Sequence, residues 1–404
     1  MLTAPPHFLM RRLCLLIAAF LCLCVTAQKP LKNIAALLKG GKAQEALTAI
    51  EQCTHDTLLR EKPVLYQYGV QAYQQLCDKA NERLYLKQKI DTAQLFSTIY
   101  GLYEYALRTD SLERHTSRKP KYHKTNIELL TGHYPNLRAA SAYFLQRKDY
   151  AAAQHYANRY FAFIQDSIWG SNTMPAALEK DQTLVARCHL LSSMQLRDYA
   201  STFRYADLAL RDTASHSLLT QQLVIAADNM GDSLRAYHIA QNGLAAHPDN
   251  SFFYRHITRY MLRHEAVQEA LMLTDSLLSL DSLSISLHEG KAALLFHHED
   301  YDDCIAAANT LLRLNPAHVR AHYLIGASYC RKAQNINLPD NIKSRAYKNG
   351  HKQRQALYEK ARTHMETFRQ LSPDKISAWG PYLYTIYLHL NMGKEFEEIN
   401  HLIE

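Results

Sequence analysis

Small side chains recur along the middle of the chain in pairs whose members are four residues apart. The pairs are Thr202 with Ala206, Ala236 with Ala240, Ala270 with Thr274, and Cys304 with Ala308, and they are evenly spaced with a period of 34. Residues four positions apart lie on one face of an α-helix, and small side chains there let a second helix approach closely. The pattern predicts a series of equivalent helices, each packed against another helix.

Turn signals follow the same period. The dipeptides that mark it are Asp198-Tyr199, Gly231-Asp232, Glu265-Ala266 and Asp300-Tyr301, and the first and last are three periods apart. Pro248 and Pro316 close two of the four blocks, at points where a helix must end. No segment shows sustained strand alternation, so we predict an all-α chain.

The stretches "GDSLRAYHIAQNGLAAHPDN" and "DYDDCIAAANTLLRLNPAH" resemble the tetratricopeptide repeat (TPR) family, whose 34-residue unit is a helix-turn-helix. Thr220, Tyr254 and His288 stand where that family often has tryptophan. The resemblance implies a TPR-type α-solenoid, a superhelical stack of about eight to nine helix pairs. It also implies a concave face, lined mainly by first helices, that holds a partner.

The resemblance extends over nearly all of residues 28–404, which we expect to form a single solenoid. Residues 33–53 fit a first unit that turns at Gly40-Gly41, and residues 62–113 fit a longer, tyrosine-rich helical pair. The clearest repeats are expected at 134–167, 183–216, 217–250, 251–284, 285–318 and 319–373, with an insertion near 333–355 in the last. A capping hairpin is expected at 376–404.

The amino terminus has the order of a secretory signal peptide. Arg11 and Arg12 precede an apolar run from Leu13 to Val25, and small residues lead to Ala27. We therefore expect residues 1–27 to be removed and the remaining chain to be exported without a transmembrane segment. Lipid attachment at Cys22 or Cys24 is the alternative, although bulky leucines precede both, where lipid-attachment motifs have small residues.

Charge and cysteine content exclude only a few classes of partner and site. The chain from Gln28 has 44 basic and 38 acidic residues, without the concentrated basic stripe that duplex nucleic acid requires. Its cysteines are odd in number, scattered and without a C-x-x-C pair, which favours packing over zinc binding and leaves one disulfide open. They are Cys53, Cys77, Cys188, Cys304 and Cys330. Two basic stretches, 114–124 and 343–354, are either solvated segments or docking sites for an acidic partner, an anionic polymer or a membrane surface.

Catalytic and metal motifs are incomplete. "HEGKA" at 288 and "HEAVQ" at 264 lack the second histidine of the zinc-protease motif H-E-x-x-H. The metal-like "LFHHEDYDDC", 295–304, falls in register on a turn and a helix start, so its ligand types are not expected to converge on one ion. His297 and His298 alone could hold a metal adventitiously. We predict no cofactor, no resident metal and no enzyme activity.

Three arginines form the sharpest candidate site. Arg255, Arg259 and Arg263 recur every fourth residue, which places them on one face of the first helix of block 251–284. By the resemblance this face is the concave one, which also carries Phe252, Arg320 and Tyr323. Their counter-charge is either Asp228 and Glu289 in neighbouring repeats or the carboxylates of a bound partner. Both interpretations remain open from the sequence.

We interpret the chain as a non-enzymatic scaffold or adaptor of a Gram-negative cell envelope, periplasmic, associated with the outer membrane, or secreted. Its expected partner is a protein or an extended peptide, an acidic one included, and not a nucleic acid. The alternatives are an envelope assembly factor or a carbohydrate-capture accessory, and then a hydrolase whose site is assembled across repeats. Partner identity and oligomeric state are not readable from the residues.

Overall fold

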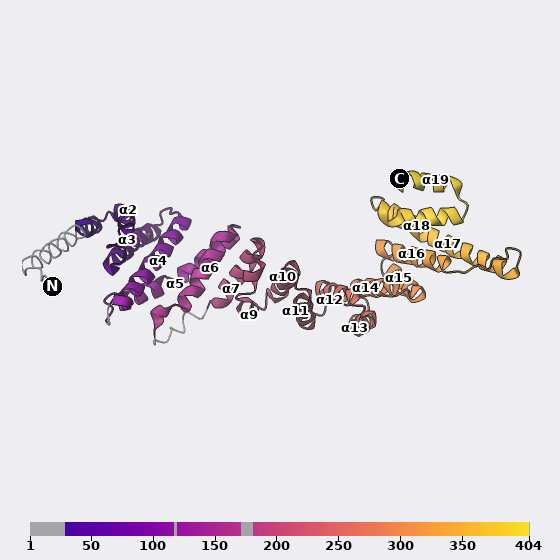
Figure 1. The fold of residues 1–404 in the computed structure, drawn as a ribbon, viewed down its shortest axis with the longest axis horizontal. Helices are drawn as coiled ribbons and strands as arrows, with labels where there is room; N and C mark the ends of the chain where they lie inside the picture. The colour runs from indigo at the N-terminus through magenta and orange to yellow at the C-terminus, as the bar shows by residue number, and fades with distance from the viewer. Residues whose placement is uncertain (1–28, 117–118, 171–180, 404) are drawn as a thin grey trace, which may run out of the picture. The chain divides into compact units, whose positions relative to one another are not determined.

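The computed structural model describes residues 29–116, 119–170 and 181–403, and all regular structure within them is helical (Figure 1). The expected signal peptide, residues 1–27, lies outside the described residues. The chain divides into two compact units, Met1–Met230 and Gly231–Glu404. The division falls inside the expected repeat 217–250, between its first and second helices. None of the described helices is both long and apolar enough to cross a bilayer.

The helices of the first unit are a helix over residues 29–39, α2 (Ala43–Thr54), α3 (Pro63–Tyr85), α4 (Thr92–Thr116), α5 (His123–Gln146), α6 (Tyr150–Ile164), the 3-10 helix η1 (Ser167–Trp169), α7 (Gln182–Gln195), α8 (Tyr199–Thr202), α9 (Ala206–Ala209) and α10 (His216–Asn229). The helices from α2 to α8 pack in chain order, each α-helix against the next, and α9 and α10 pack against α7. The first helices α5 and α7 of two successive pairs also pack side by side.

The second unit has the same construction. Its helices are α11 (Ser233–Ala246), α12 (Ser251–Arg263), α13 (Val267–Leu280), α14 (Ile285–His297), α15 (Tyr301–Leu314), α16 (Val319–Gln334), α17 (Arg345–Leu371), α18 (Ile376–His389) and α19 (Gly393–Ile403). The first helices α12, α14, α16 and α18 also contact one another in succession. They therefore form one continuous layer of this unit, and the second helices form the other.

A common turn produces the period of the repeat. One residue with positive φ marks each turn, and these residues are evenly spaced: Arg197, Gly231, Glu265 and Glu299. At Arg197, Glu265 and Glu299, this residue and the next donate main-chain hydrogen bonds back to carbonyls of the preceding helix, as in a Schellman motif. At two of the four turns the following residue, Asp198 or Asp232, caps the second helix by accepting a main-chain N–H.

The pairs of small residues lie where the helices meet. Thr202, Ala236, Ala270, Cys304 and their partners four residues on are all buried, and the most accessible of the eight, Ala206, is 8% exposed. The five cysteines from Cys53 onward are buried and free of disulfide bonds in the structure. Burial raises the pKa of Cys330 to about 12, which keeps this thiol protonated and suits packing rather than reactivity.

Two elements differ from the expected repeat. The second helix of block 183–216 is broken at Phe203–Tyr205 into α8 and α9, and the Tyr205 ring stacks on Phe161 with centroids 3.8 Å apart. In the expected insertion near 333–355, residues 345–355 form the first turns of α17. Ser344 caps these turns by accepting the Tyr347 N–H at 3.0 Å, and helix-favouring Arg, Ala, Lys and Gln follow.

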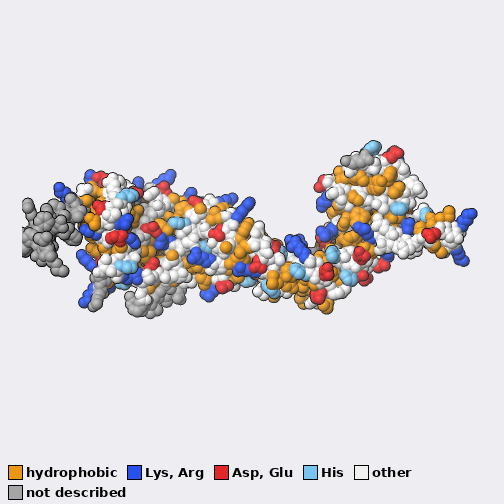
Figure 2. All heavy atoms as spheres, in the orientation of Figure 1, with side chains coloured by type: hydrophobic (Ala, Val, Ile, Leu, Met, Phe, Trp, Pro, Cys, Tyr) orange, Lys and Arg blue, Asp and Glu red, His pale blue; other side chains and the backbone are white. Residues whose placement is uncertain are grey.

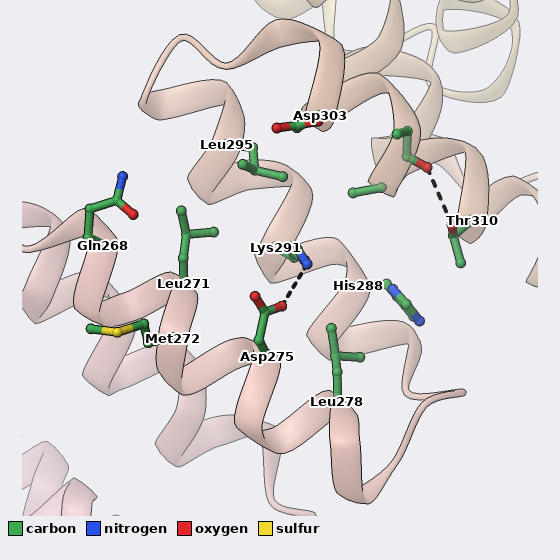
Figure 3. A pocket seen from close by; sticks show the side chains of 12 residues that line it. Gln268, Leu271, Met272, Asp275, Leu278, His288, Lys291, Leu295, Asp303 and Thr310 are labelled. Atoms are coloured by element: carbon green, nitrogen blue, oxygen red, sulfur yellow. Dashed lines mark hydrogen bonds and ion pairs between the residues drawn. The ribbon is translucent and has the colours of Figure 1, made fainter.

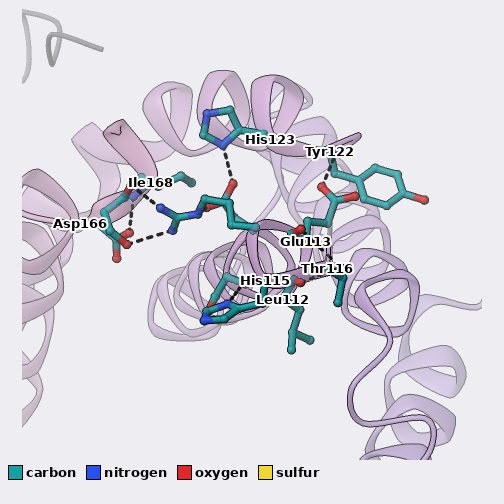
Figure 4. A network of polar contacts seen from close by, with 12 residues as sticks. Leu112, Glu113, His115, Thr116, Tyr122, His123, Asp166 and Ile168 are labelled. Carbon is teal, nitrogen blue, oxygen red and sulfur yellow. Dashed lines mark hydrogen bonds and ion pairs between the residues drawn. The ribbon is translucent and has the colours of Figure 1, made fainter. Parts of the chain in front are cut away.

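A buried carboxylate organises the end of α4 (Figure 4). Asp110 is fully buried and pairs with Arg114 Nε at 2.7 Å and with His123 Nδ1 of α5. The Arg114 guanidinium also donates to the main-chain oxygen and the hydroxyl of Ser167, which ties η1 to α4. Glu113 accepts the main-chain N–H groups of Lys121 and Tyr122. Within the described part of the basic stretch 114–124, these contacts serve packing.

A buried histidine makes the first unit sensitive to acid. His189 is 1% exposed, and its Nε2 lies 3.1 Å from Asn158 Oδ1. Burial, helped by the charge of Arg204, lowers the pKa of His189 from 6.5 to about 4. Above pH 6.5 this imidazole is neutral in both the folded and the unfolded chain. Between pH 6.5 and 4 only the unfolded chain takes up the proton, so stability falls as the pH falls.

We therefore expect His189→Gln to weaken the pH dependence of unfolding of the first unit. Relative to this variant, the wild-type free energy of unfolding should fall by about 1.4 kcal/mol per pH unit between the two pKa values. Trp169 and Trp379 are the two tryptophans, so Trp169 fluorescence in a Trp379→Phe background reports urea unfolding of the first unit. Parallel pH profiles for wild type and variant would contradict the assignment.

Candidate functional site

The first helices of the second unit present equivalent positions once in every repeat. Because the repeats keep the same spacing, Phe252, Ser286 and Arg320 share one register position, as do Arg255, Glu289 and Tyr323. Arg263, His297 and Arg331 share another. Side chains at these positions project from the α12–α14–α16 layer, and two adjoining pockets open on it.

The first pocket has a volume of about 200 Å³ and is basic. Its lining residues are Tyr254, Arg255, Thr258, Arg259, Leu262, Ser286, Glu289, Gly290, Ala293, Leu294 and Arg320. The Tyr254 ring packs directly on Gly290, where a Cβ atom would lie 2.2 Å from the Tyr254 oxygen. Only glycine permits this contact between α12 and α14. The Tyr254 hydroxyl also forms a hydrogen bond with the Thr274 hydroxyl, with 2.9 Å between the two oxygens, and this bond holds the ring in place.

Of the three arginines that line this pocket, only Arg320 has an acidic partner among the described residues. Glu289 lies 3.4 Å from Arg320 Nε and, through its other oxygen, 3.4 Å from His318 Nε2. Arg255 and Arg259 are exposed, and neither makes a salt bridge to any residue that the structure describes. Glu289, one of the two acidic residues considered as a counter-charge for Arg255, Arg259 and Arg263, therefore pairs with Arg320 of the next repeat instead. The other expected counter-charge, Asp228, lies on α10 in the first unit.

The second pocket, of about 570 Å³, is more aromatic. Leu262, Ala293 and Arg320 line both pockets, so the two are continuous. The other lining residues are Phe296, His297, Glu299, Tyr301, Tyr323, Leu324, Arg331 and Asn335. The Tyr323 ring is packed against Phe368 and Tyr382, with centroids 5.3 and 5.9 Å away. This packing gives the pocket a fixed aromatic wall.

The six residues proposed from the sequence occupy different places. Arg255, Arg259, Arg320 and Tyr323 line the two pockets, which places them around one continuous groove. Arg263 is exposed at the end of α12 and lines neither pocket. Phe252 is half-buried, and its ring stacks on His256 with centroids 5.6 Å apart.

The sequence reasoning missed Arg331, Phe296 and Leu262, all of which line the groove. Register was the available signal, because Arg331 lies two repeats after Arg263 at the same position of the unit. The second basic stretch, 343–354, lies elsewhere, at the start of α17. Its Lys and Arg side chains are visible at the free end of that helix (Figure 2).

A third pocket lies among α13, α14 and α15 (Figure 3) and has a volume of about 560 Å³. Leu271, Met272 and Leu278 supply apolar lining, and Lys291 Nζ lies 2.6 Å from Asp275 Oδ1 across it. Because the lysine is paired inside the pocket, it does not require a ligand to neutralise it. This distinguishes the third pocket from the arginine-lined one.

The residues that suggested metal binding separate in the structure. His297 lines the second pocket, whereas His298 Nδ1 lies 2.8 Å from Asp300 Oδ2. Cys304 is buried and accepts a hydrogen bond from Ser328. Among the described residues no three His, Cys, Asp or Glu side chains gather closely enough to hold a metal ion. In the "HEGKA" segment, Ala292 is fully buried in the core.

The sequential helix pairs, their regular spacing and the shared turn define an all-α, TPR-type α-solenoid. No family model and no curated protein matches the chain. One similar solved structure is the C-terminal part of a TPR repeat-containing protein from Cytophaga hutchinsonii, with a TM-score of 0.45, 10% identity, and coverage of 65% of this chain and 92% of that one.

Two further solved structures have lower scores. YrrB, described as a TPR protein with an unusual peptide-binding site, has a TM-score of 0.34 and 15% identity, covering 50% of this chain and 93% of its own. MamA has a TM-score of 0.35 and 12% identity, covering 49% of this chain and 95% of its own. With TM-scores this low, these likenesses carry no inference about the site or the function of this chain.

Proposed function

We propose that this protein is a non-enzymatic scaffold that holds an extended peptide or protein segment in the groove along α12, α14 and α16. The observation that carries the proposal is the pair Arg255 and Arg259, which line a pocket without a salt-bridge partner among the described residues. Grouped like charges repel one another, and a bound carboxylate removes that repulsion. Placement in a bacterial envelope rests on the expected signal peptide and belongs to the same proposal.

The groove favours a ligand with an acidic group next to an apolar one. Arg255 and Arg259 are one helical turn apart, about 6 Å along the axis, so one carboxylate can accept hydrogen bonds from both. The continuous second pocket offers Phe296 and Tyr323 to an apolar side chain. Three arginines and a single aromatic residue, Tyr254, line the first pocket, which supports a peptide over a carbohydrate.

Binding of labelled peptides tests this proposal. The probes are extended peptides that alternate Asp or Glu with Leu or Phe, and matched peptides in which Asn and Gln replace the acids. We expect wild type to bind the acidic set more tightly, and Arg255→Ala with Arg259→Ala to weaken that binding roughly ten- to a hundredfold, as expected for lost hydrogen bonds between charged groups. Fluorescence anisotropy measures both effects.

The matched control is Arg313→Ala, which removes an exposed arginine of α15 whose guanidinium bonds Thr310. This variant should bind the acidic peptides as wild type does. Equal binding of the acidic and amide peptides by wild type would contradict the proposal. So would unchanged binding by the double variant, since the two arginines would then have only a structural role.

A further inference from the structure

The connection between α3 and α4 carries an exposed apolar tip. Residues 81–89 are all exposed, including the last turn of α3. Within this segment Leu84, Tyr85 and Leu86 are consecutive, with exposed fractions of 46%, 87% and 55%. Three adjacent apolar side chains that stay in water make no contribution to the core of the unit. Their exposure therefore calls for a contact outside the unit.

The tip lies on an edge of the first unit that is rich in cations. Successive helices of this unit are joined by turns and pack against each other, so the carboxyl ends of residues 29–39, α3, α5 and α7 share one edge. Exposed Lys or Arg side chains occur at each of these helix ends. They are Lys39 and Lys42, Lys87 and Lys89, Arg147 and Lys148, and Arg197.

The cations occupy a costly backbone position. Lys87, Lys148 and Arg197 have φ values of 55°, 63° and 58°, in the left-handed region that glycine adopts most easily. A side chain there costs about 1 kcal/mol relative to glycine. At the corresponding turns of the second unit the same position holds Gly231, Glu265, Glu299 and Asn391, none of them a cation. The positive sign is therefore a property of the first unit and not of the turn.

The acids at this edge are engaged within the unit. Asp91, Asp149 and Asp198 accept the main-chain N–H groups of Gln94, Ala152 and Ser201, at the amino ends of the following helices. Helix N-termini stabilise negative charge, so these carboxylates are compensated there. Among the described residues, Lys87, Lys148 and Arg197 make no salt bridge. Asp78 and Glu82, in the last turns of α3, are also exposed, but the exposed Lys79, Arg83, Lys87 and Lys89 outnumber them and leave the edge with a positive balance.

We propose that this edge docks on the surface of an anionic phospholipid bilayer. Leu84, Tyr85 and Leu86 enter the headgroup region, where leucine is buried and tyrosine favours the interface. Lys87, Lys148 and Arg197 face the lipid phosphates, and each contributes on the order of 1 kcal/mol near an anionic surface. This function is separate from the arginine-lined groove, because it uses another unit and another class of partner.

Vesicle co-sedimentation with the full chain tests the proposal. We expect the chain to bind vesicles of phosphatidylcholine with phosphatidylglycerol at least about tenfold more tightly than vesicles of phosphatidylcholine alone. Replacing Leu84, Tyr85 and Leu86 by serine should weaken binding to the anionic vesicles by roughly tenfold or more. The apolar run Leu13–Val25 is unchanged in all variants, so differences between them report the edge and not that run.

A charge variant tests the contribution of the cations to vesicle binding, and a control variant tests whether exposed apolar side chains elsewhere contribute. Lys87→Glu with Lys148→Glu should abolish the preference for anionic vesicles while leaving binding to neutral ones unchanged. The matched control replaces Leu280, Leu283 and Ile285 of the second unit by serine, which removes apolar side chains that are 76%, 70% and 43% exposed. This control should bind as wild type does.

The proposal is overturned if wild type does not distinguish the two vesicle types, or if the tip and charge variants bind as wild type does. It is also overturned if the lipid-free protein is oligomeric and the tip variants are monomeric, because the tip would then join copies of the chain. All substituted side chains are exposed, so the variants should unfold with the same urea midpoint as wild type.

Discussion

Replacing Phe253 with alanine should lower the free energy of unfolding of the second unit by about 3–5 kcal/mol. The ring is fully buried and packs against Gly243 of α11, where a Cβ atom would lie 2.5 Å from it. Because the neighbouring position is glycine, no side chain is available to fill the space that alanine leaves. Urea unfolding followed by Trp379 fluorescence, with Trp169 replaced by phenylalanine, measures the loss in this unit.

Phe252→Ala is the matched control, since this ring lies on the same helix and is only half-buried. Phe252→Ala should lower the free energy of unfolding by clearly less than Phe253→Ala does, because fewer contacts are lost. Gly243→Ala should also destabilise, because the added methyl group overlaps the Phe253 ring. Combining it with Phe253→Leu should recover part of that loss, and the double-mutant cycle measures the coupling. A Phe253→Ala loss below that of Phe252→Ala would contradict the packing described.

Replacing Arg114 with alanine should destabilise the first unit by about 3–5 kcal/mol, because it leaves the fully buried carboxylate of Asp110 without its guanidinium partner. The substitution also removes the two hydrogen bonds to Ser167 that hold η1. Trp169, the last residue of η1, is buried in this unit, so its fluorescence reports the urea transition directly.

Arg108→Ala provides the control on the same helix. Arg108 is exposed and lies 4.0 Å from Glu61, and such surface pairs contribute roughly 0–1 kcal/mol. Asp110→Leu combined with Arg114→Met removes both charges and should recover much of the loss, since a buried pair replaced by apolar groups is often neutral. If Arg114→Ala cost no more than Arg108→Ala, the network would not stabilise the fold.

The helical class and the turns were predictable because they depend on local residue types. Small residues four positions apart recur in all four blocks, and Asp starts the second helix in three of them, so periodicity exposes both in the sequence. The break of one second helix at Phe203–Tyr205 was not predictable. It accompanies the stacking of Tyr205 on Phe161 of α6, a contact between residues more than one repeat apart in the sequence.

The candidate groove was predictable in part. The spacing of Arg255 and Arg259 is enough to place them on one helix face, and the register places Arg320 and Tyr323 on equivalent faces. The pairing of charges was not predictable, because Glu289 has arginines before and after it in the layer and the structure pairs it with Arg320. Nor could the spacing show that Phe252 stacks on His256 and lines neither pocket.

Spacing along the chain was enough to establish the 34-residue period, the helix-turn-helix unit and the face of α12 that carries the arginines. The packed structure was needed to learn which charges are paired, which aromatic rings wall the groove and that Leu84, Tyr85 and Leu86 stay exposed. These properties depend on distances between residues of different helices. Such distances are set by how the repeats pack, and no local pattern records them.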